Sequence, residues 1–142
     1  MKQRDVTFTV LGIILLTTAV FYAVKPKLKR YAESVSCVNR MSAICFGATM
    51  WAEDNDKCMP ADFLSISNIL DTPRILICPS DHSRQAAINW ASFTAKNTSY
   101  VIVAPTISES DTNTVYLRCN IHTNHLGYVH GYVFDGRRIR PK

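Results

Sequence analysis

An uncharged apolar run from Val6 to Val24 constrains this chain more than any other feature of its sequence. As an α-helix rising ~1.5 Å per residue, such a run reaches ~28 Å, about the thickness of the hydrocarbon core of a bilayer. A cleaved secretory signal has a shorter apolar part and small residues at its exit, which the segment 19–23 matches poorly. We therefore expect an uncleaved, single-pass transmembrane helix, with a removed signal as the alternative.

The net charge of +5 lies entirely around this run. Residues 1–30 hold six basic residues and one acidic residue, whereas the rest of the chain holds ten of each. Charges placed there can meet lipid headgroups, and a neutral globular part offers no basic groove for nucleic acid. Counting basic residues on the two sides of the run favours, taken alone, a cytoplasmic C-terminal domain.

Apolar residues recur at helical spacing after the membrane run. Residues 31–52 predict a continuing helix with an apolar stripe on one side, and Pro26 is expected to kink or interrupt it. The stripe comprises Cys37, Met41, Ile44, Ala48 and Trp51, widened by Val38, Cys45 and Ala52. A one-sided stripe of this kind needs another layer to cover it.

The remaining chain predicts connections followed by a sheet. A second short helix is expected from about residue 61 to before Pro73, a short buried strand or extended segment over 73–79, and a helical turn or two near 86–90. From Ser99 the pattern changes to alternating and β-branched residues, which predicts strands within 99–104, 113–119 and 127–134. The Asp135-Gly136 pair is a hairpin signal. The expected fold class is therefore α+β, with a long N-terminal helix packed on a small antiparallel sheet.

Several local strings, taken in order, resemble those of the type IV pilin-like proteins, in particular the type II secretion pseudopilins. FTVLG, from Phe8, resembles the start of the mature family sequence, and the short basic leader before it fits a prepilin. Matches continue in LDTPRILICPSDHSR (70–84) and NTSY (97–100). His125, nine residues and then Asp135-Gly136 match a signature of related proteins. Further matching positions in 36–60 are Cys37, Asn39, Ile44, Trp51, Ala52, Asp54, Asn55 and Pro60.

The resemblance implies a pilin-like domain arrangement. Residues 1–30 would form the leader and transmembrane stem, and 31–142 a globular domain with a helix (31–52), connections (53–98) and a sheet (99–140). It also implies a subunit of the bacterial inner membrane, with a periplasmic C-terminal domain, that assembles with other pilin-like subunits through its N-terminal helix. On this basis we expect contact with membrane lipid, and no cofactor and no small-molecule substrate.

Two positions depart from the family pattern. The prepilin peptidase prefers glycine or alanine before its cut, where this chain has Thr7. Gly12 stands where the family has a glutamate that is thought to pair with a neighbouring subunit's new amino terminus. These departures favour a minor or tip-like subunit, or a relative that stays anchored in the membrane.

Five cysteines provide the remaining chemistry, and an odd number cannot all pair within one chain. Cys78 and His82, with Cys119 and His122, form a Cys/His quartet of the kind that binds zinc. A Cys78–Cys119 disulfide is the alternative that we favour in an oxidising compartment. A membrane-anchored periplasmic metal-binding module is therefore the second hypothesis. No catalytic motif is present, and His125 with Asp135 is interpreted as structural, so we expect no enzyme.

Overall fold

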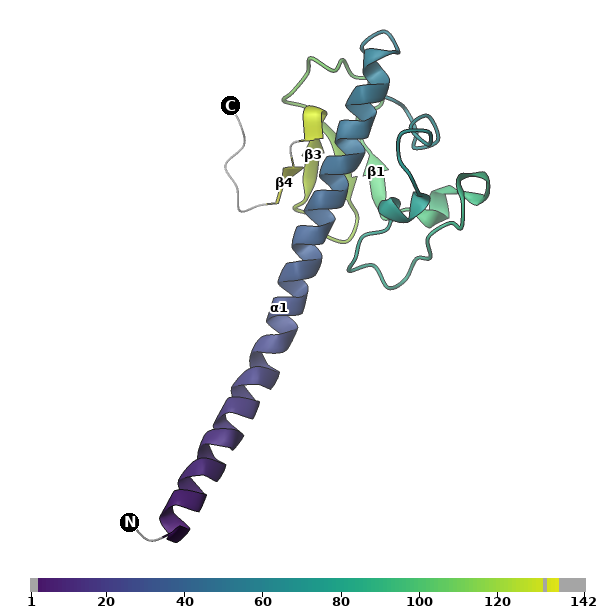
Figure 1. Ribbon diagram of the computed structural model, residues 1–142. Helices are drawn as coiled ribbons and strands as arrows, with labels where there is room; N and C mark the ends of the chain where they lie inside the picture. The colour runs from purple at the N-terminus through teal and green to yellow at the C-terminus, as the bar shows by residue number, and fades with distance from the viewer. Residues whose placement is uncertain (1–2, 132, 136–142) are drawn as a thin grey trace. The chain divides into compact units, whose positions relative to one another are not determined.

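The computed structural model describes residues 3–131 and 133–135, with side chains from residue 12 onward. Its elements are a long helix α1 (Gln3–Glu53), strands β1 (Tyr100–Ile102), β2 (Val115–Cys119), β3 (Leu126–Tyr128) and β4 (Val133–Phe134), and four short 3₁₀ helices. The predicted α+β class is confirmed: a long N-terminal helix packs on a small antiparallel sheet, which is a pilin-like architecture (Figure 1).

The chain divides into two compact units, Met1–Glu33 and Ser34–Lys142. Helix α1 begins in the first unit and continues through Pro26, so the interruption expected there as an alternative to a kink is wrong. A proline removes a single helical hydrogen bond, and the helix tolerates that loss. In the first unit the Nζ atom of Lys29 lies 3.8 Å from Oε1 of Glu33, one helical turn away.

Among the described residues, none of the helices combines the length and the apolarity that crossing a bilayer requires. The side chains of residues 6–11, which open the predicted membrane run and include Phe8, lie outside the described part of the chain.

The four strands form one antiparallel sheet in the order β1-β2-β3-β4. Tyr100 pairs with Cys119 and Leu126 pairs with Phe134. The register of β2 against β3 shifts between Val115 and Leu117, which is a β-bulge. Because a bulge breaks the alternation of faces, two successive residues of β2, Tyr116 and Leu117, are both buried.

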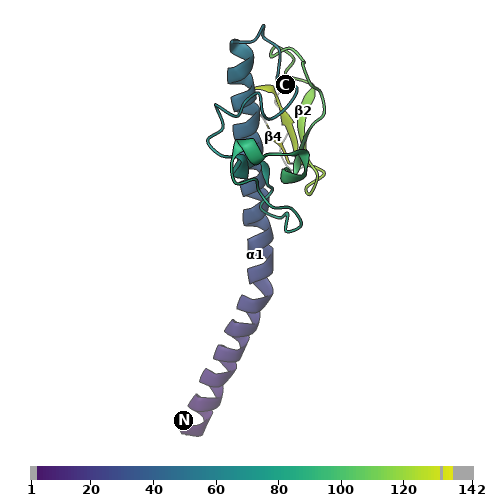
Figure 2. The same ribbon diagram turned by 90° about the vertical axis from the view of Figure 1, so that its right-hand side faces the viewer.

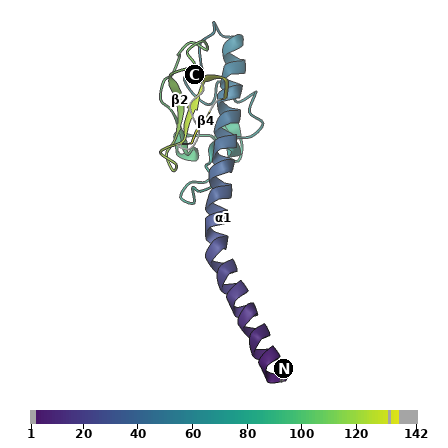
Figure 3. The same cartoon turned by 90° about the vertical axis from the view of Figure 1, so that its left-hand side faces the viewer.

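The C-terminal part of α1, residues 34–53, covers one face of this sheet. Figures 2 and 3 show the strands gathered on one side of the helix. The predicted stripe is confirmed as the buried face, with the most deeply buried members being Cys37, Met41, Ile44, Cys45, Ala48 and Ala52. Full burial of a side chain such as Met41 or Ile44 contributes roughly 1.5–3 kcal/mol.

Gly127 of β3 permits the close approach of helix and sheet. A Cβ atom at this position would lie 2.8 Å from Sγ of Cys45 and 3.1 Å from Cβ of Leu117. Both separations are shorter than ordinary van der Waals contact. Glycine is therefore required where β3 passes under α1.

The turn after β3 forms hydrogen bonds with α1. The Oγ atom of Ser42 donates a hydrogen bond of 2.6 Å to the carbonyl of Gly131, and the N–H of His130 donates one of 3.1 Å to Oγ1 of Thr49. This turn divides the predicted strand 127–134 into β3, the 3₁₀ helix η4 (Val129–Gly131) and β4. Gly136, half of the predicted hairpin signal, lies outside the described residues.

The segment joining α1 to the sheet contains turns rather than the predicted helix after residue 61. Phe63, Ile66 and Leu70 are buried at helix-like spacing, yet the chain folds into successive turns. Backbone hydrogen bonds here span three residues, from Ser67 to Leu64 and from Ile69 to Ile66, as in turns and not as in an α-helix. Further along come the 3₁₀ helices η1 (Pro73–Leu76), η2 (Trp90–Ser92) and η3 (Ala95–Asn97).

Candidate metal centre

Three thiols and an imidazole converge where α1 meets the sheet. The group consists of Cys37, Cys78, Cys119 and His122, and its ligand atoms all lie within 4.8 Å of one another. Tetrahedral Zn²⁺ with Zn–S distances of ~2.3 Å holds its sulfur ligands ~3.8 Å apart. The four side chains are thus spaced so that one metal ion can reach all of them after small adjustments.

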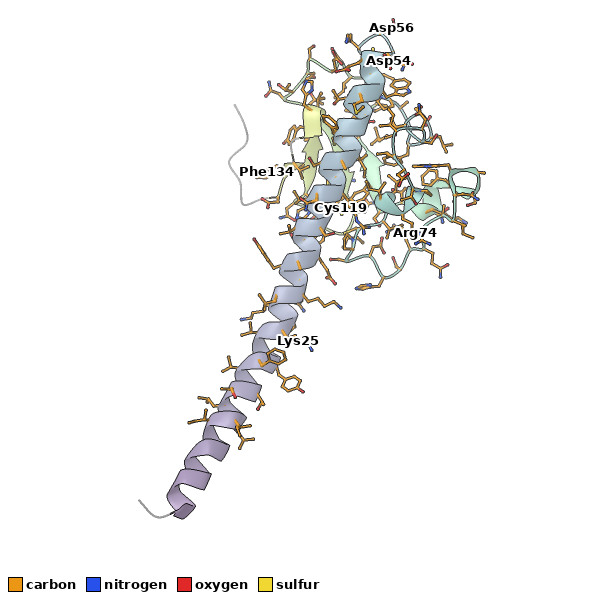
Figure 4. All side chains as sticks on the ribbon, viewed as in Figure 1. Lys25, Asp54, Asp56, Arg74, Cys119 and Phe134 are labelled. Carbon is orange, nitrogen blue, oxygen red and sulfur yellow. The ribbon has the colours of Figure 1, made fainter. Side chains whose placement is uncertain are left out.

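Each ligand comes from a different local structure. Cys37 belongs to the buried face of α1, and Cys119 is the last residue of β2, which Figure 4 shows beside the helix. His122 follows in the bend after β2, and its N–H donates a hydrogen bond of 3.3 Å to Sγ of Cys119. This backbone contact keeps His122 close to the sulfur that precedes it in sequence.

Cys78 is held by a buried polar network. Its N–H donates a hydrogen bond of 3.0 Å to Oγ of Ser99, whose hydroxyl donates one of 2.6 Å to Oδ2 of Asp81. The N–H of Asp81 in turn donates to the carbonyl of Cys78 at 2.9 Å. The turn that carries Cys78 is therefore closed on itself and fixed to the residue that precedes β1.

Asp81 is the buried charge that organises this turn. Its side chain is 1% exposed and accepts hydrogen bonds from Ser83 and from Nη1 of Arg84, the latter at 2.7 Å. Burial alone would raise the pKa of Asp81, but the hydrogen bonds from Ser99, Ser83 and Arg84 outweigh it and lower this pKa well below its usual value. Asp81 is therefore a stable carboxylate within the fold.

The imidazole of His122 is oriented by contacts at both ring nitrogens. Its Nδ1 atom lies 3.4 Å from Sγ of Cys78, and its Nε2 atom lies 3.4 Å from Oγ of Ser80. The ring also stacks on that of His125, with centroids 4.4 Å apart and planes inclined by 20°. Metal-binding histidines usually have their second ring nitrogen hydrogen-bonded in this manner.

The three sulfurs lie close enough together to shift one another's pKa values. Hydrogen bonds from Cys37 and Cys78, then from the backbone of His122 and Ile121, lower the pKa of Cys119 far below its usual value, although burial opposes the change. The hydrogen bond to Cys119 raises the pKa of Cys37 and raises that of Cys78 to about 11. Of the three thiols, Cys119 therefore loses its proton most readily.

The structure brings together three of the four residues in the predicted quartet. His82 is exposed and does not belong to the group, because the turn after Cys78 directs it to the surface. Cys37 takes the fourth place. The sequence pattern accounts for Cys37 as a member of the apolar helical stripe and gives no sign that it is a ligand. Only the packing of α1 against the end of β2 places Cys37 beside Cys119.

All five cysteines are free thiols in the structure, so the predicted Cys78–Cys119 disulfide is not formed in it. The two residues are nevertheless neighbours, as that prediction required. A third sulfur, that of Cys37, shares the site with them. Three thiols that lie together cannot all be paired, and the hydrogen-bonded arrangement accommodates all of them at once.

His125 of the predicted family signature is buried beside this group. Its Nδ1 atom lies 3.3 Å from Sγ of Cys37, and its Nε2 atom lies 3.2 Å from Oγ of Ser34. The backbone carbonyl of Asp135 accepts a hydrogen bond of 2.7 Å from Asn124. The ring of His125 therefore links α1 to the segment that enters β3.

The chain matches no family model, no curated protein and no solved structure.

Proposed function

We propose that this chain is a structural, pilin-like subunit of the bacterial inner membrane. It assembles through its N-terminal helix in a type II secretion or type IV pilus-like system, with its C-terminal domain in the periplasm. The pilin-like architecture and the ordered series of family strings support this role. Its partners are other pilin-like subunits and membrane lipid, and the role involves neither an enzymatic activity nor nucleic acid.

The observation that carries the proposal is the apolar surface of α1 in the first unit. Ile13, Ile14, Leu15 and Leu16 are each more than half exposed. Four successive residues of a helix point in directions ~100° apart, so this surface extends all the way round the helix. A helix that is apolar on every side is stable when lipid or other apolar helices surround it.

The two departures from the family pattern favour a minor subunit. Apart from the neighbouring turns of its own helix, no described atom lies within 4 Å of the place where a side chain on Gly12 would begin. A main subunit would carry a glutamate there to attract the next subunit's amino terminus. A subunit without that attraction joins the filament through apolar contacts alone.

A Leu16→Cys variant of the full-length chain tests this assembly in native membranes. Cys58, the half-buried thiol, is first changed to serine so that it does not react. We expect oxidation to give a ladder of cross-linked species, because the stems pack side by side. Asp71→Cys, at an exposed position in the second unit, is the matched control and should remain monomeric. A monomeric Leu16→Cys chain that washes off membranes at high pH would contradict the proposal.

The metal-ligand group favours a second candidate, a membrane-anchored periplasmic metal-binding module. In that case α1 serves only to anchor the chain, and the head exchanges its metal with other molecules. The Leu16→Cys variant would then remain monomeric after oxidation, while the chain would still sediment with membranes. The mass of the mature amino terminus adds an independent measurement, since a start at Phe8 indicates pilin-type processing and an intact Met1 indicates a simple anchor.

A further inference from the structure

We propose that Cys37, Cys78, Cys119 and His122 bind one Zn²⁺ ion as a structural site that fastens α1, the Cys78 turn and the end of β2 together. This inference concerns the architecture of the head and does not depend on whether the stem assembles into a filament.

The donor set selects the metal. Thiolate sulfur and imidazole nitrogen are the ligands of structural zinc sites, and three cysteines with one histidine are an established combination. Calcium and magnesium prefer oxygen ligands and are therefore disfavoured. Among the metals that thiolates bind, we favour Zn²⁺, because it takes tetrahedral geometry and does not change its oxidation state.

The surroundings of the ligands are arranged to support them. The hydroxyl of Tyr100 lies 3.7 Å from Sγ of Cys37, and the N–H of His122 donates to Sγ of Cys119. Donors of this kind offset the excess negative charge that three thiolates leave around a divalent cation. The contact between Ser80 and Nε2 of His122 leaves Nδ1 facing Cys78 and hence available to the metal.

The site is closed by the protein. All three cysteines are buried, and His122 is half-buried. Four protein ligands complete a tetrahedron, so no coordination position remains for water or substrate. A closed site of this type stabilises structure rather than catalysing a reaction.

Bound zinc would join segments that are remote in sequence. Forty residues separate Cys37 from Cys78, and another forty separate Cys78 from Cys119. The part of this segment that follows α1, residues 54–77, is built mainly of turns and the 3₁₀ helix η1. It has few regular backbone hydrogen bonds, so a metal cross-link at its end would restrict the unfolded chain and stabilise the native one.

Metal analysis of the purified full-length chain in detergent tests the site. We expect one zinc per chain in the wild type and loss of that zinc in Cys78→Ser and His122→Ala. His82→Ala and Cys58→Ser are the matched controls, because the first removes a nearby exposed histidine and the second a half-buried thiol outside the group. Both controls should retain a full equivalent.

A second measurement keeps the inference testable if the ligand variants fail to fold. The wild-type chain is stripped with a chelator under reducing conditions and then titrated with Zn²⁺ or Co²⁺. We expect one equivalent of Zn²⁺ to raise the unfolding temperature, and Co²⁺ to give the intense absorption of a tetrahedral thiolate complex. A reduced, folded chain that binds neither ion would overturn the proposal, as would a purified chain with a stable disulfide among the three cysteines and no zinc.

Discussion

The Nδ1 atom of His125 lies 3.3 Å from Sγ of Cys37, so a buried imidazole from the sheet side of the head contacts a proposed metal ligand on α1. The same ring stacks on His122, a second proposed ligand. His125 therefore contacts two of the four ligands without belonging to the set. This arrangement makes it a positioning residue for the metal site.

Replacement of His125 by alanine is expected to weaken zinc binding about tenfold or more, because groups that orient metal ligands commonly have effects of this size. The affinity is measured by competition with a chromophoric chelator. One equivalent of zinc should still bind when the metal is in excess, since all four ligands remain. His82→Ala provides the control and should leave the affinity unchanged. An unaltered affinity in His125→Ala would show that the ring serves packing alone.

The helix and sheet could be predicted because their patterns depend on local spacing. The stripe from Cys37 to Trp51 defines one helical face, and alternation after Ser99 marks the strands. The segment 61–72 misled because the apolar spacing of Phe63, Ile66 and Leu70 suits a helix and also suits successive turns. The two structures differ in their backbone hydrogen bonds, such as that from Ser67 to Leu64, and periodicity does not report these.

The metal-ligand group could be predicted only in part. Cys78, Cys119 and His122 were candidates because a cysteine and a histidine lie close together in each local string. The exposure of His82 and the position of Cys37 beside the other ligands are not determined by the local sequence. Both depend on the register of β2 and on the turn that the Ser99–Asp81 contact closes. Only the tertiary structure distinguishes the predicted set, which contains His82, from the observed set, which contains Cys37 in its place.

Replacement of Gly127 by alanine should destabilise the head by about 1–3 kcal/mol, the usual result of forcing an extra methyl group into a packed core. The new Cβ atom would lie 2.8 Å from Sγ of Cys45, so β3 and α1 must separate. Urea unfolding of the full-length chain in detergent gives the free energy of unfolding of the head. Gly12→Ala is the matched control and should leave that value unchanged.

A double variant tests whether Cys45 is the obstacle. Cys45→Ala removes the sulfur that the new methyl group would meet. Combined with Gly127→Ala, it should cost less than the two single changes added together, because the methyl group then occupies the vacated space. Simple additivity would mean that the contact with Cβ of Leu117, and not the contact with the Cys45 sulfur, causes the loss of stability.

Replacement of Tyr116 by phenylalanine should lower the free energy of unfolding by about 1 kcal/mol. The hydroxyl of Tyr116 donates a buried hydrogen bond of 2.8 Å to the carbonyl of Pro60, which joins the bulged strand to the chain just after α1. The variant leaves that carbonyl without this donor. Tyr22→Phe, at an exposed side chain, provides the comparison and should have no effect on head unfolding. Equal stability of the two variants would contradict the expected contribution.

Replacement of Asp81 by asparagine should lower the stability of the head at neutral pH by about 2 kcal/mol, since buried hydrogen bonds to a charged group are lost. The pKa of Asp81 is lower in the folded state than the ~3.9 of an unfolded aspartate. Its stabilisation is therefore present above ~pH 5 and declines as the pH falls through the folded pKa. The wild type should lose stability across this acid range more steeply than the variant does.

The pH dependence is measured by urea unfolding of metal-stripped protein between pH 2 and 7, so that protonation of bound thiolates does not contribute. The wild-type and Asp81→Asn curves should converge toward the acid end, because protonation removes from the wild type the charge that the variant already lacks. Asp71→Asn, at an exposed aspartate of the same connecting segment, should follow the wild type throughout. Parallel wild-type and Asp81→Asn curves would mean that Asp81 stabilises the Cys78 turn by its shape and not by its charge.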